Sequence, residues 1–428
     1  MMLNKKVLII SPYFPPVNAA DMQRVRMSLP YFKDFGWDAE VVTVDESYVD
    51  MVKDNLLLQS IPKDIRIHKV KALDKSWTSK IGLGSIALRS LLYYKQTVNA
   101  LLKRGSYNLI YFSTTQFPVC ILGAYWKRRY GISYVIDMQD PWHSDYYRDK
   151  PKSQRPPKYW FSYRLNKYLE PIAIKKAGGL ISVSQAYIDV LKKRYPAIKN
   201  IPAETITFGL FEPDLEIAIK NSEAFPSVLN YGYFNIVYVG RGGADMHKAI
   251  APLFSAFKNG LQTDKELFNK IKFHFIGTSY APTGSGTPTI APLAAEYGIE
   301  DHVIEITDRI SYYHSLAILQ KADALFVPGS DDPQYSASKI YPCLLMKKPL
   351  LTVLHPHSNV VNMLKTCVEN ALVFTFETPA LETVIQYTLT QWANSKADAV
   401  VLNNNADAYT AKNLTGKQVE LFNQVLKR

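Results

Sequence analysis

The sequence predicts an α/β fold with two Rossmann-like domains that face each other across a cleft. The chain has 428 residues, more than one compact core normally accommodates, so we expect two domains of roughly 200 residues each. Short apolar segments alternate with helical patterns along the chain, which is typical of parallel sheets with crossover helices. The alternation stops in an acidic stretch without a strong period, residues 210–233, and then starts again. We therefore place the interdomain linker in that stretch.

The first half begins with an apolar strand at residues 6–11, which we interpret as the start of the fold and not as a signal peptide. A loop with three prolines follows, and Asp21 is expected to cap a helix that ends at Gly36. The strand–helix–strand order of this beginning favours a parallel sheet. Further strands are predicted at 37–44, 65–70, 108–112, 134–137 and 178–184, and further helices at 83–102, 117–130, 164–176 and 185–193.

The second half repeats this alternation, and the two similar halves are the basis for predicting two Rossmann-like domains. Its strands are predicted at 234–239, 271–276, 303–307, 324–327 and 349–353, and its helices at 247–260, 292–297, 312–320, 338–346, 380–394 and 406–427.

A glycine turn follows the first strand of the second half. The strand at 234–239 runs directly into the sequence GRGG at 240–243, and a helical pattern opens near His247. Glycines let a backbone approach a ligand closely, and a helix N-terminus attracts anions. Because Arg241 and Lys248 add two cations, the turn is a candidate site for a phosphate or diphosphate. An ordinary strand-to-helix turn with two solvated cations fits the same residues.

Polar and aromatic residues follow the strand at 134–137 in the first half. In open parallel sheets, ligands bind outside the carboxyl ends of the strands. Asp140, Trp142 and His143 are therefore candidates for the cleft. For Trp142, a half-buried position in an ordinary loop is an equal alternative.

The positive charge of the chain is concentrated in its first half. Residues 1–200 hold 32 Lys and Arg against 16 Asp and Glu, whereas residues 231–428 hold 17 of each. A one-sided basic field attracts membrane lipid, nucleic acid or a phosphorylated substrate. A soluble protein that is merely basic would show the same composition.

Seven basic and seven aromatic residues are interleaved within residues 146–168. This combination suits contact with the headgroups of an anionic membrane surface. Single-stranded nucleic acid could also stack on such a segment. An exposed loop followed by a helix with a solvated cationic face is the plainer interpretation.

The cysteine pattern and the hydropathy indicate the compartment. Cys120, Cys343 and Cys367 lie far apart in apolar segments, which indicates a reduced environment without a disulfide framework or a zinc site. No apolar stretch approaches the length of a membrane span. We expect a cytoplasmic protein, with peripheral association at the inner membrane face as a further option.

Five segments carry a resemblance to a known family. They are VLIISPYFPP at 7–16, the strand that leads from Asp137 to Trp142, AGGLISVS at 177–184, the Gly-Arg pair at 240–241 with Lys248, and SKIYPCLLMKKPLL at 338–351. In this order and spacing, the chain resembles the GT-B glycosyltransferases, in particular the family 4 retaining enzymes of bacterial cell-surface polysaccharide synthesis. The resemblance extends over nearly the whole chain.

The resemblance implies an enzyme that moves a sugar from a nucleotide diphosphate sugar to a glycan or polyprenyl-linked acceptor. It implies that residues 1–208 bind the acceptor and that residues 209–428 bind the donor. The final helix, at about 409–428, would pack back on the first domain. The nucleotide sugar is a co-substrate, and no metal ion or other cofactor is implied.

The family's site residues carry over position by position. Arg241 and Lys248 match the pair that holds the donor diphosphate, where two cations stabilise the charge that develops on the leaving group. Asp140 and His143 are the further catalytic candidates, for acceptor or sugar contacts. The candidates for substrate binding are Gly240 and Gly242 in the glycine turn, Ser338 and Lys339 at a helix N-terminus, Asn18 and Ala19 in the loop that corresponds to the family's glycine-rich loop, Gln334, and Tyr341.

The chain departs from the family pattern at the donor site. Many members carry two Glu residues eight positions apart, and Gln334 and Pro342 occupy those positions here. Asp331 or Asp332 is a candidate for a displaced carboxylate because of its proximity in sequence. Two other classes stay open: a catalytically silent GT-B partner protein that binds nucleotide or glycan, and a nucleotide-sugar epimerase of the same architecture. A nucleic-acid binder that uses residues 146–168 is the least favoured alternative.

Overall fold

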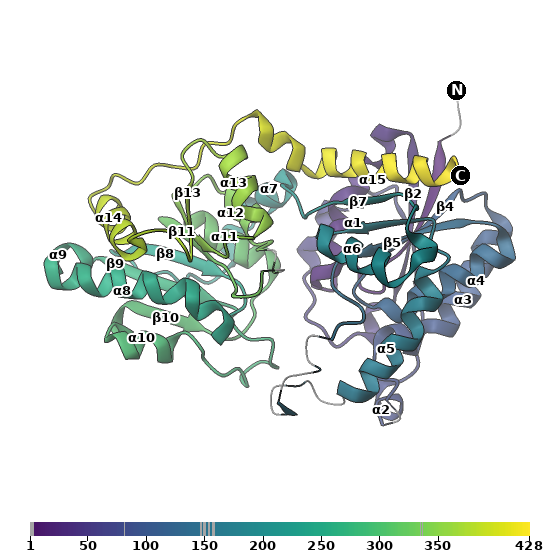
Figure 1. Cartoon of the computed structure of the whole chain (residues 1–428), viewed down its shortest axis with the longest axis horizontal. Coiled ribbons are helices and arrows are strands. Elements are labelled where there is room, and N and C mark those ends of the chain that lie inside the picture. Colours follow the sequence, from purple (N-terminus) through teal and green to yellow (C-terminus); the bar gives the residue numbers. More distant parts are fainter. Residues whose placement is uncertain are drawn as a thin grey trace. The chain divides into compact units, whose positions relative to one another are not determined.

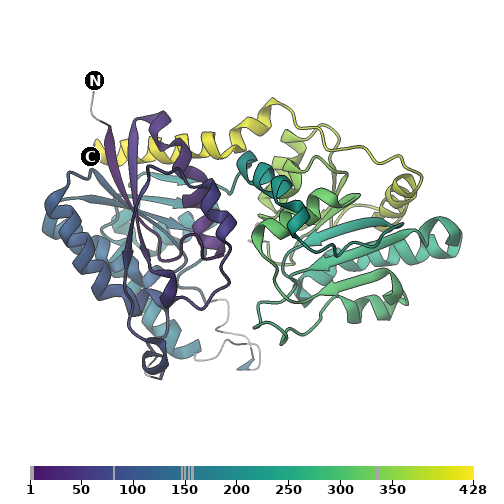
Figure 2. The ribbon, with the colours of Figure 1, turned by 180° about the vertical axis from the view of Figure 1, so that it is seen from behind.

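The computed structural model describes the chain except for residues 1–3, 81, 146, 147, 149, 150, 153, 154, 156–158, 334 and 336. The chain divides into two compact units (Figures 1 and 2). Unit 1 comprises Met1–Phe208 together with Ala411–Arg428, and unit 2 comprises Gly209–Thr410. Each unit is built on one parallel sheet with helices on its faces, as the alternation of patterns predicts.

Unit 1 contains a seven-stranded sheet in the order β3-β2-β1-β4-β5-β6-β7. Its strands are β1 (Lys5–Ile10), β2 (Trp37–Val44), β3 (Arg66–Val70), β4 (Leu109–Ser113), β5 (Ser133–Met138), β6 (Gly179–Ser182) and β7 (Ala203–Thr205). Its α-helices are α1 (Gln23–Ser28), α2 (Lys75–Thr78), α3 (Ile86–Arg104), α4 (Ile121–Tyr130), α5 (Tyr159–Ile174), α6 (Gln185–Arg194) and α15 (Ala411–Leu426).

Adjacent residues of β4 show how helices cover both faces of this sheet. Successive side chains of a strand point to opposite faces. The ring of Tyr111 lies 5.1 Å from that of Phe422 in α15, measured between ring centroids, and the ring of Phe112 stacks at 6.0 Å on Trp126 in α4. Helix α15 therefore covers one face, and the layer that contains α3, α4 and α5 covers the other.

The last helix of the chain is an integral part of unit 1. Phe422 is fully buried and packs edge-on against Trp37 of β2 at 5.5 Å. The side-chain amide of Gln418 donates a hydrogen bond to the Ser28 hydroxyl oxygen (2.8 Å). A Cβ on Gly179 would lie 2.7 Å from Val425, so this glycine permits the close packing of β6 against α15.

Unit 2 contains a six-stranded sheet in the order β10-β9-β8-β11-β12-β13. Its strands are β8 (Phe234–Val239), β9 (Ile271–Ile276), β10 (Val303–Ile306), β11 (Ala324–Pro328), β12 (Leu350–Leu354) and β13 (Leu372–Thr375). Its α-helices are α7 (Glu212–Lys220), α8 (His247–Thr263), α9 (Lys265–Phe268), α10 (Ala291–Tyr297), α11 (Tyr312–Lys321), α12 (Ile340–Leu345), α13 (Asn359–Cys367) and α14 (Leu381–Ala393).

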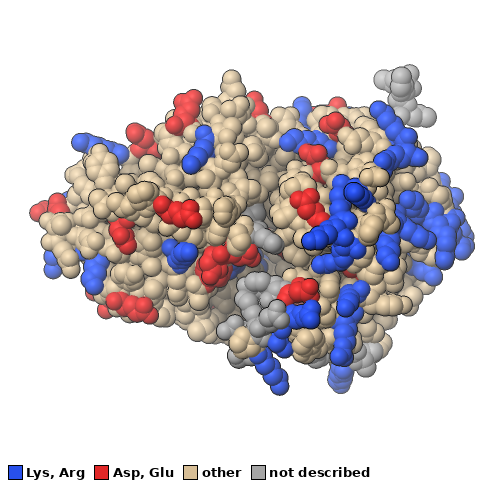
Figure 3. Space-filling model, in the orientation of Figure 1, with Lys and Arg blue, Asp and Glu red and all other residues tan. Residues whose placement is uncertain are grey.

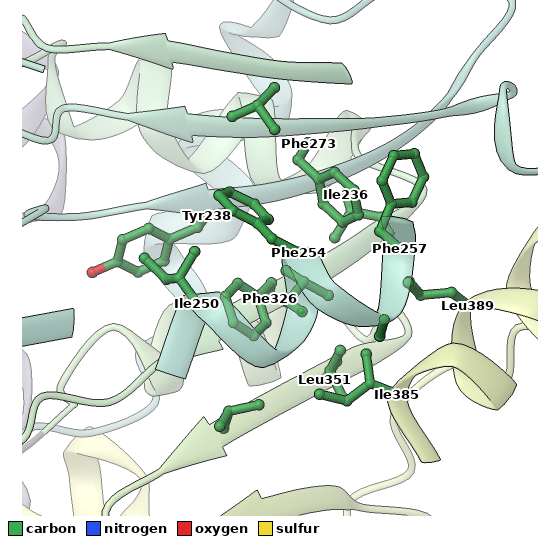
Figure 4. Close-up of a cluster of buried hydrophobic side chains, with 14 of the residues drawn as sticks. Ile236, Tyr238, Ile250, Phe254, Phe257, Phe273, Phe326, Leu351, Ile385 and Leu389 are labelled. Atoms are coloured by element: carbon green, nitrogen blue, oxygen red, sulfur yellow. The ribbon is translucent and has the colours of Figure 1, made fainter. Parts of the chain in front are cut away.

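The core of unit 2 lies between this sheet and the helices α8 and α14 (Figure 4). Phe254 and Phe257 of α8 are fully buried and meet Phe273 of β9 edge-on. Ile385 and Leu389 of α14 close the same cluster. Burial of several large apolar side chains at once is the main source of stability for such a layer. The helix therefore holds the glycine turn, which precedes it, in a fixed position on the sheet.

The predicted strands and long helices are confirmed, and their ends shift by a few residues. The helix expected up to Gly36 is broken into a 3₁₀ turn at Ala20–Met22, helix α1 and a 3₁₀ stretch at Leu29–Phe35. The acidic stretch placed in the linker contains α7, which packs on α11 through hydrogen bonds from Tyr312 and Tyr313 to Asp214, each 2.8 Å long. Strands β7 and β13 and helix α13 were not expected, because each is short or only partly apolar.

Two further observations concern the cysteines and the hydrophobicity of the helices. Cys120, Cys343 and Cys367 are all buried and free. Among the described residues, no helix combines the length and hydrophobicity that crossing a membrane requires.

Candidate functional site

Unit 2 has a topological switch point between β8 and β11. The chain leaves β8 toward β9 on one side of the sheet, and it comes back to β11 on the other side. The loops that follow two such strands diverge, and ligands of open parallel sheets bind between them. The loop after β8 is the glycine turn. The sequence motif and the sheet topology thus point to the same place within unit 2.

The glycine turn is shaped by contacts inside unit 2. The N–H of Gly242 donates to the carbonyl oxygen of Thr278 (2.7 Å), which ties the turn to the end of β9. A Cβ on Gly240 would lie 2.3 Å from the hydroxyl oxygen of Tyr238, so this position has room only for glycine. Gly243 has a φ of +140°, which L side chains rarely adopt. The packing of the turn therefore explains these glycines by itself. The close approach of a ligand is a second possible reason for them.

Arg241 lies between a carboxylate and an aromatic ring. Its Nη1 is 2.9 Å from Oδ1 of Asp245, and its Nη2 is 2.5 Å from Oδ2. The guanidinium carbon lies 4.8 Å from the centre of the Tyr335 ring. Burial acts to raise the pKa of Asp245, but the hydrogen bonds from Arg241 and Ser330 outweigh it and lower that pKa. The pair is therefore fully ionised at neutral pH.

Asp245 also joins the two loops of the switch point. Its Oδ2 accepts a hydrogen bond from the Ser330 hydroxyl (2.6 Å), and its carbonyl oxygen accepts one from the N–H of Asp331 (2.8 Å). The N–H of Asp332 donates to the Ser330 hydroxyl oxygen (3.1 Å). The candidate carboxylates Asp331 and Asp332 are thus placed next to the glycine turn, on the loop that follows β11.

Lys248 is the second residue of α8 and is exposed. Its Nζ lies 5.1 Å from the centre of the Phe376 ring, just after β13. Arg241 and Lys248 therefore both lie at the carboxyl edge of the sheet, and Lys248 keeps its ammonium group open to solvent.

The residues predicted around α12 differ in their positions. Lys339 precedes the first turn of this six-residue helix. Part of its side chain is accessible to water, yet the protein atoms around it and the charge of Arg309 lower the pKa of its ammonium group. Ser338 is half-buried, whereas Tyr341 is buried and stacks on Tyr409 at 6.3 Å. Gln334 lies outside the described residues.

Unit 1 has its own switch point, between β1 and β4, and Asp21 bridges the loops there. Its Oδ2 accepts hydrogen bonds from the Thr114 hydroxyl (2.9 Å) and from both the N–H (3.0 Å) and the hydroxyl (3.1 Å) of Thr115. The prediction that Asp21 caps a helix is wrong, because its acceptor is used by the loop after β4. Burial raises the pKa of this carboxyl, and the hydrogen bonds from Thr115 and Thr114 oppose that rise.

A buried ion pair supports the same edge of the sheet in unit 1. The Nε of Arg24 donates to Oδ2 of Asp137 at 2.7 Å, and both side chains are almost wholly inaccessible to solvent. The hydroxyl of Ser113 (2.8 Å) and the amide of Gln139 (3.0 Å) donate to the same oxygen. Arg24 also donates to the carbonyl oxygen of Ile206 (2.7 Å). The pair therefore fixes the ends of β4, β5 and the segment after β7.

Asp140 is the acidic candidate of unit 1. Its side chain is accessible at the surface, yet the surrounding atoms and the charge of Asp21 raise its pKa to about 6. A carboxyl with such a pKa exchanges its proton near neutral pH, as a general acid or base must. Its neighbour Trp142 is buried and stacks on Phe117 at 5.4 Å, so it belongs to the core of unit 1.

His143 is held from both sides of its backbone. Its N–H donates to Oε2 of Glu170 (2.9 Å), and its carbonyl oxygen accepts from Arg194 (3.0 Å). Burial and the charge of Arg194 lower the pKa of the imidazole, which is therefore neutral at pH 7. Among the described residues, no group forms a hydrogen bond with its buried Nε2. His143 thus has a positioned, neutral ring whose Nε2 has no described partner.

Asn18 and Ala19 lie in the loop after β1. The N–H of Asn18 donates to the carbonyl oxygen of Val52 (2.9 Å), which pins the loop to the segment after β2. Ala19 is buried, whereas Asn18 is half-buried and keeps part of its side chain accessible. Asn18 is the better placed of the two to contact a ligand.

The chain matches no family model, and no curated protein matches it significantly. Solved structures match it along its whole length. The N-terminal domain of a trehalose-6-phosphate phosphatase from Candida albicans has 13% identity and a TM-score of 0.61, and the match covers 99% of this chain and 97% of that one. The chain has the GT-B fold.

Two other similar structures support this assignment. A glycosyltransferase from Rickettsia africae matches with 13% identity and a TM-score of 0.57 over 99% of both chains. HepE from Anabaena, in complex with UDP, matches with 15% identity and a TM-score of 0.53 over 97% of this chain and 95% of that one. At these identities, the similarity establishes the fold, with its two Rossmann-like domains, and not the chemistry.

Sequence reasoning missed the contacts that hold each of the two sites together. Asp245 and Asp137 are each the partner of an arginine, and Asp21 bridges two loops. The sequence contained one signal for Asp245, because it lies four residues after Arg241, the spacing of ion pairs on a helix. The residues between them form a turn and not an α-helix, so this spacing did not predict the pair. Across the described residues, no group of three or more His, Cys, Asp and Glu side chains is arranged to hold a metal ion.

Proposed function

We propose that the protein is a glycosyltransferase that moves a sugar from a nucleotide diphosphate sugar to a glycan or lipid-linked acceptor. The observation that carries the proposal is the position of Arg241 and Lys248 at the switch point of unit 2, in a chain with the GT-B fold. The UDP bound to the similar Anabaena protein supports a nucleotide donor.

Two cations at this edge suit the chemistry of the leaving group. Breaking the bond between the sugar and the diphosphate leaves negative charge on the diphosphate, and fixed cations nearby stabilise that charge in the transition state. Arg241 offers a planar, bidentate donor, and Lys248 offers a mobile ammonium group. In the proposal these two side chains, with no metal ion or other cofactor, balance the charge.

Unit 1 would bind the acceptor. Asp140 has a pKa near 6 and lies in the electrostatic field of Asp21, so it is suited to accept a proton from an acceptor hydroxyl. His143 and Asn18 would orient the sugar or the acceptor. From the sequence resemblance, we further propose retention of configuration and a role in cell-surface polysaccharide synthesis.

A turnover assay tests the proposal. The release of UDP from UDP-glucose, or of the nucleotide from other sugar nucleotides, is measured with a bacterial lipid and glycan extract as the acceptor source. We expect release that falls by about a hundredfold or more in Lys248→Ala, because a fixed charge at the leaving group is lost. The matched control is Lys258→Ala, an exposed lysine further along α8. Equal rates in the two variants contradict the assigned role of Lys248.

A second candidate function is that of a catalytically silent nucleotide-binding partner. The observation that favours it is the bidentate pair between Arg241 and Asp245, which already satisfies one of the two cations. Nucleotide binding without release from any sugar nucleotide is the result expected for this class.

A further inference from the structure

We propose that unit 1 docks on an anionic lipid bilayer through the outer surface of helices α4 and α5. This "α4–α5 surface" is defined by exposed residues of α5 and by the cations at the ends of both helices. They are Trp160, Phe161, Arg164, Lys167, Tyr168, Ile172, Lys175 and Lys176 of the α5 segment, and Arg128 and Arg129 of α4. The inference does not depend on the proposed reaction, because it uses none of the residues that are assigned to the donor or the acceptor.

Apolar and basic residues alternate along one face of α5. Phe161, Arg164, Tyr168, Ile172 and Lys175 follow one another at intervals of three or four, which places them on one side of the α5 segment. Trp160 lies beside Arg164 at the edge of that side. The exposed fractions are 47% for Trp160, 70% for Tyr168 and 40% for Ile172. Large apolar side chains this open to water, gathered on one helix face, indicate a contact surface.

Helix α4 extends this face with positive charge. The two helices pack against each other, and the Nζ of Lys127 donates to the carbonyl oxygen of Lys176 (3.1 Å), so their C-terminal ends lie together. Arg128 and Arg129 are exposed at this end. Figure 3 shows Lys and Arg gathered over the part of unit 1 in which Figure 1 places α4.

Helices α4 and α5 contribute almost no negative charge to this face. Helix α4 has no acidic residue, and α5 has only Glu170, which is buried and paired with Arg194 at 2.5 Å. The positive field of the surface is therefore not balanced by carboxylates of its own two helices. Anionic headgroups are a partner of matching charge.

The α2 segment adds aromatic area beside the N-terminal end of α5. A Cβ on Gly82 would lie 3.0 Å from the ring of Phe161, so the loop after α2 packs directly on α5. Figures 1 and 2 both show α2 next to this end of the helix. Trp77 of α2 is 49% exposed. Two tryptophans and a phenylalanine are thus presented at one end of the surface.

A bilayer fits this composition better than a nucleic acid. Tryptophan and tyrosine prefer the headgroup level of a membrane, where lysine and arginine reach the phosphates and aliphatic side chains enter the acyl region. Nucleic acids use aromatic stacking and cations, but they provide no apolar environment for Ile172. We therefore commit to the lipid surface as the partner.

Vesicle co-sedimentation of the full-length protein tests the inference. Vesicles of phosphatidylcholine alone are compared with vesicles that also contain phosphatidylglycerol. We expect binding to the mixed vesicles that weakens with salt, and little binding to phosphatidylcholine alone. Equal binding to both vesicle types, or no binding to either, overturns the proposal.

Two double variants locate the contact. In Arg128→Glu/Lys175→Glu the partition coefficient on mixed vesicles should fall by about tenfold or more, because two cations near the headgroups become anions. In Trp160→Ser/Tyr168→Ser the partition coefficient should fall at high salt as well, because the apolar side chains then supply most of the binding free energy. Circular dichroism and the melting temperature verify that each variant is folded.

Matched controls use exposed residues of unit 2. Lys258→Glu/Lys270→Glu changes the net charge equally, and Tyr231→Ser/Tyr387→Ser removes two aromatic rings that are exposed as well. Binding should stay at the wild-type level in both controls. If the controls reduce vesicle binding as much as the α4–α5 variants do, the assignment of the surface is wrong. If the two α4–α5 variants lose affinity for a single-stranded oligonucleotide and keep their affinity for vesicles, the partner of this surface is a nucleic acid and not a membrane.

Discussion

Arg241 and Asp245 form a bidentate ion pair at the carboxyl end of β8, with nitrogen–oxygen distances of 2.9 and 2.5 Å. The arginine that the sequence assigns to a donor diphosphate is thus held by a carboxylate of the same turn. A diphosphate that binds Arg241 has to share the guanidinium with Asp245 or displace it. The same carboxylate accepts a hydrogen bond from Ser330 after β11, so displacement would also loosen the connection between the two loops.

The Asp245→Asn variant should bind UDP more tightly than the wild type does. The amide keeps an acceptor for Ser330 but removes the negative charge that competes with the diphosphate. Because the pair is partly exposed, it contributes roughly 0.5–1 kcal/mol, so the dissociation constant should fall about twofold to fivefold. Titration calorimetry measures this change. The double variant Arg241→Ala/Asp245→Asn should show no gain, and weaker binding in Asp245→Asn alone would mean that the carboxylate orients Arg241 for the ligand.

Asp140 should make the stability of the protein depend on pH between about pH 4 and 6. Its pKa in the folded protein is about 6, raised by the surrounding protein atoms and by Asp21, so folding disfavours the ionised form. Its contribution is fully present below the pKa of the unfolded state and is lost as the pH rises through 6. The Asp140→Asn variant should therefore gain stability relative to the wild type as the pH increases from 5 to 7.

The size of this gain should be about 0.5 kcal/mol, because solvent screens a group that is accessible at the surface. Urea denaturation at pH 5, 6, 7 and 8 measures it. A difference between variant and wild type that is constant over this range would show that Asp140 has an ordinary pKa.

Loss of Arg24 should destabilise unit 1 strongly. Its partner Asp137 has no exposed side-chain area, so removing the guanidinium leaves a buried carboxylate without its counter-charge. Such a change costs about 3–5 kcal/mol. We expect this decrease in the free energy of unfolding for Arg24→Met, measured by urea denaturation. The control is Lys412→Ala, which breaks the exposed pair with Asp34 (3.0 Å) and should cost less than about 1 kcal/mol. Equal effects of the two variants would contradict the structural role of Arg24.

The displaced-carboxylate hypothesis predicts a nucleotide contact from Asp331 or Asp332. Both follow β11 and adjoin the glycine turn through Ser330 and Asp245. If one of them accepts a hydrogen bond from the ribose, its replacement by alanine should weaken UDP binding by roughly tenfold or more. Asp301→Ala, an exposed acid before β10, is the control. An unchanged affinity for UDP in both Asp331→Ala and Asp332→Ala would refute the hypothesis.

The sequence predicted the parts of the fold that depend on local patterns. Strand β8 is apolar except for Asn235, and α8 has a clear helical period, so both were found with the turn between them. Strand β13 is half-buried and only four residues long, and its place in the sheet depends on pairing with β12, so no local pattern revealed it.

The candidate sites likewise contain some features that local sequence patterns reveal and others that depend on contacts between distant residues. The glycine turn and its two cations could be read from consecutive residues. The contacts of Asp21 with Thr114 and Thr115 join residues more than ninety positions apart, and the Arg24–Asp137 pair joins residues 113 positions apart. Such pairs are specified by the order of strands in the sheet, which the sequence of a single chain does not display.

The most direct test of the central claim is a calorimetric titration of the wild type and of Arg241→Ala with UDP, GDP, ADP and dTDP. The account predicts that one nucleotide binds the wild type clearly more tightly than the others, and that Arg241→Ala lowers this affinity by about tenfold or more, because a bidentate contact to the diphosphate is lost. Lys258→Ala should bind as the wild type does. Failure of all four nucleotides to bind, or equal affinity in the wild type and in Arg241→Ala, would contradict the assignment of the donor site to the glycine turn of unit 2.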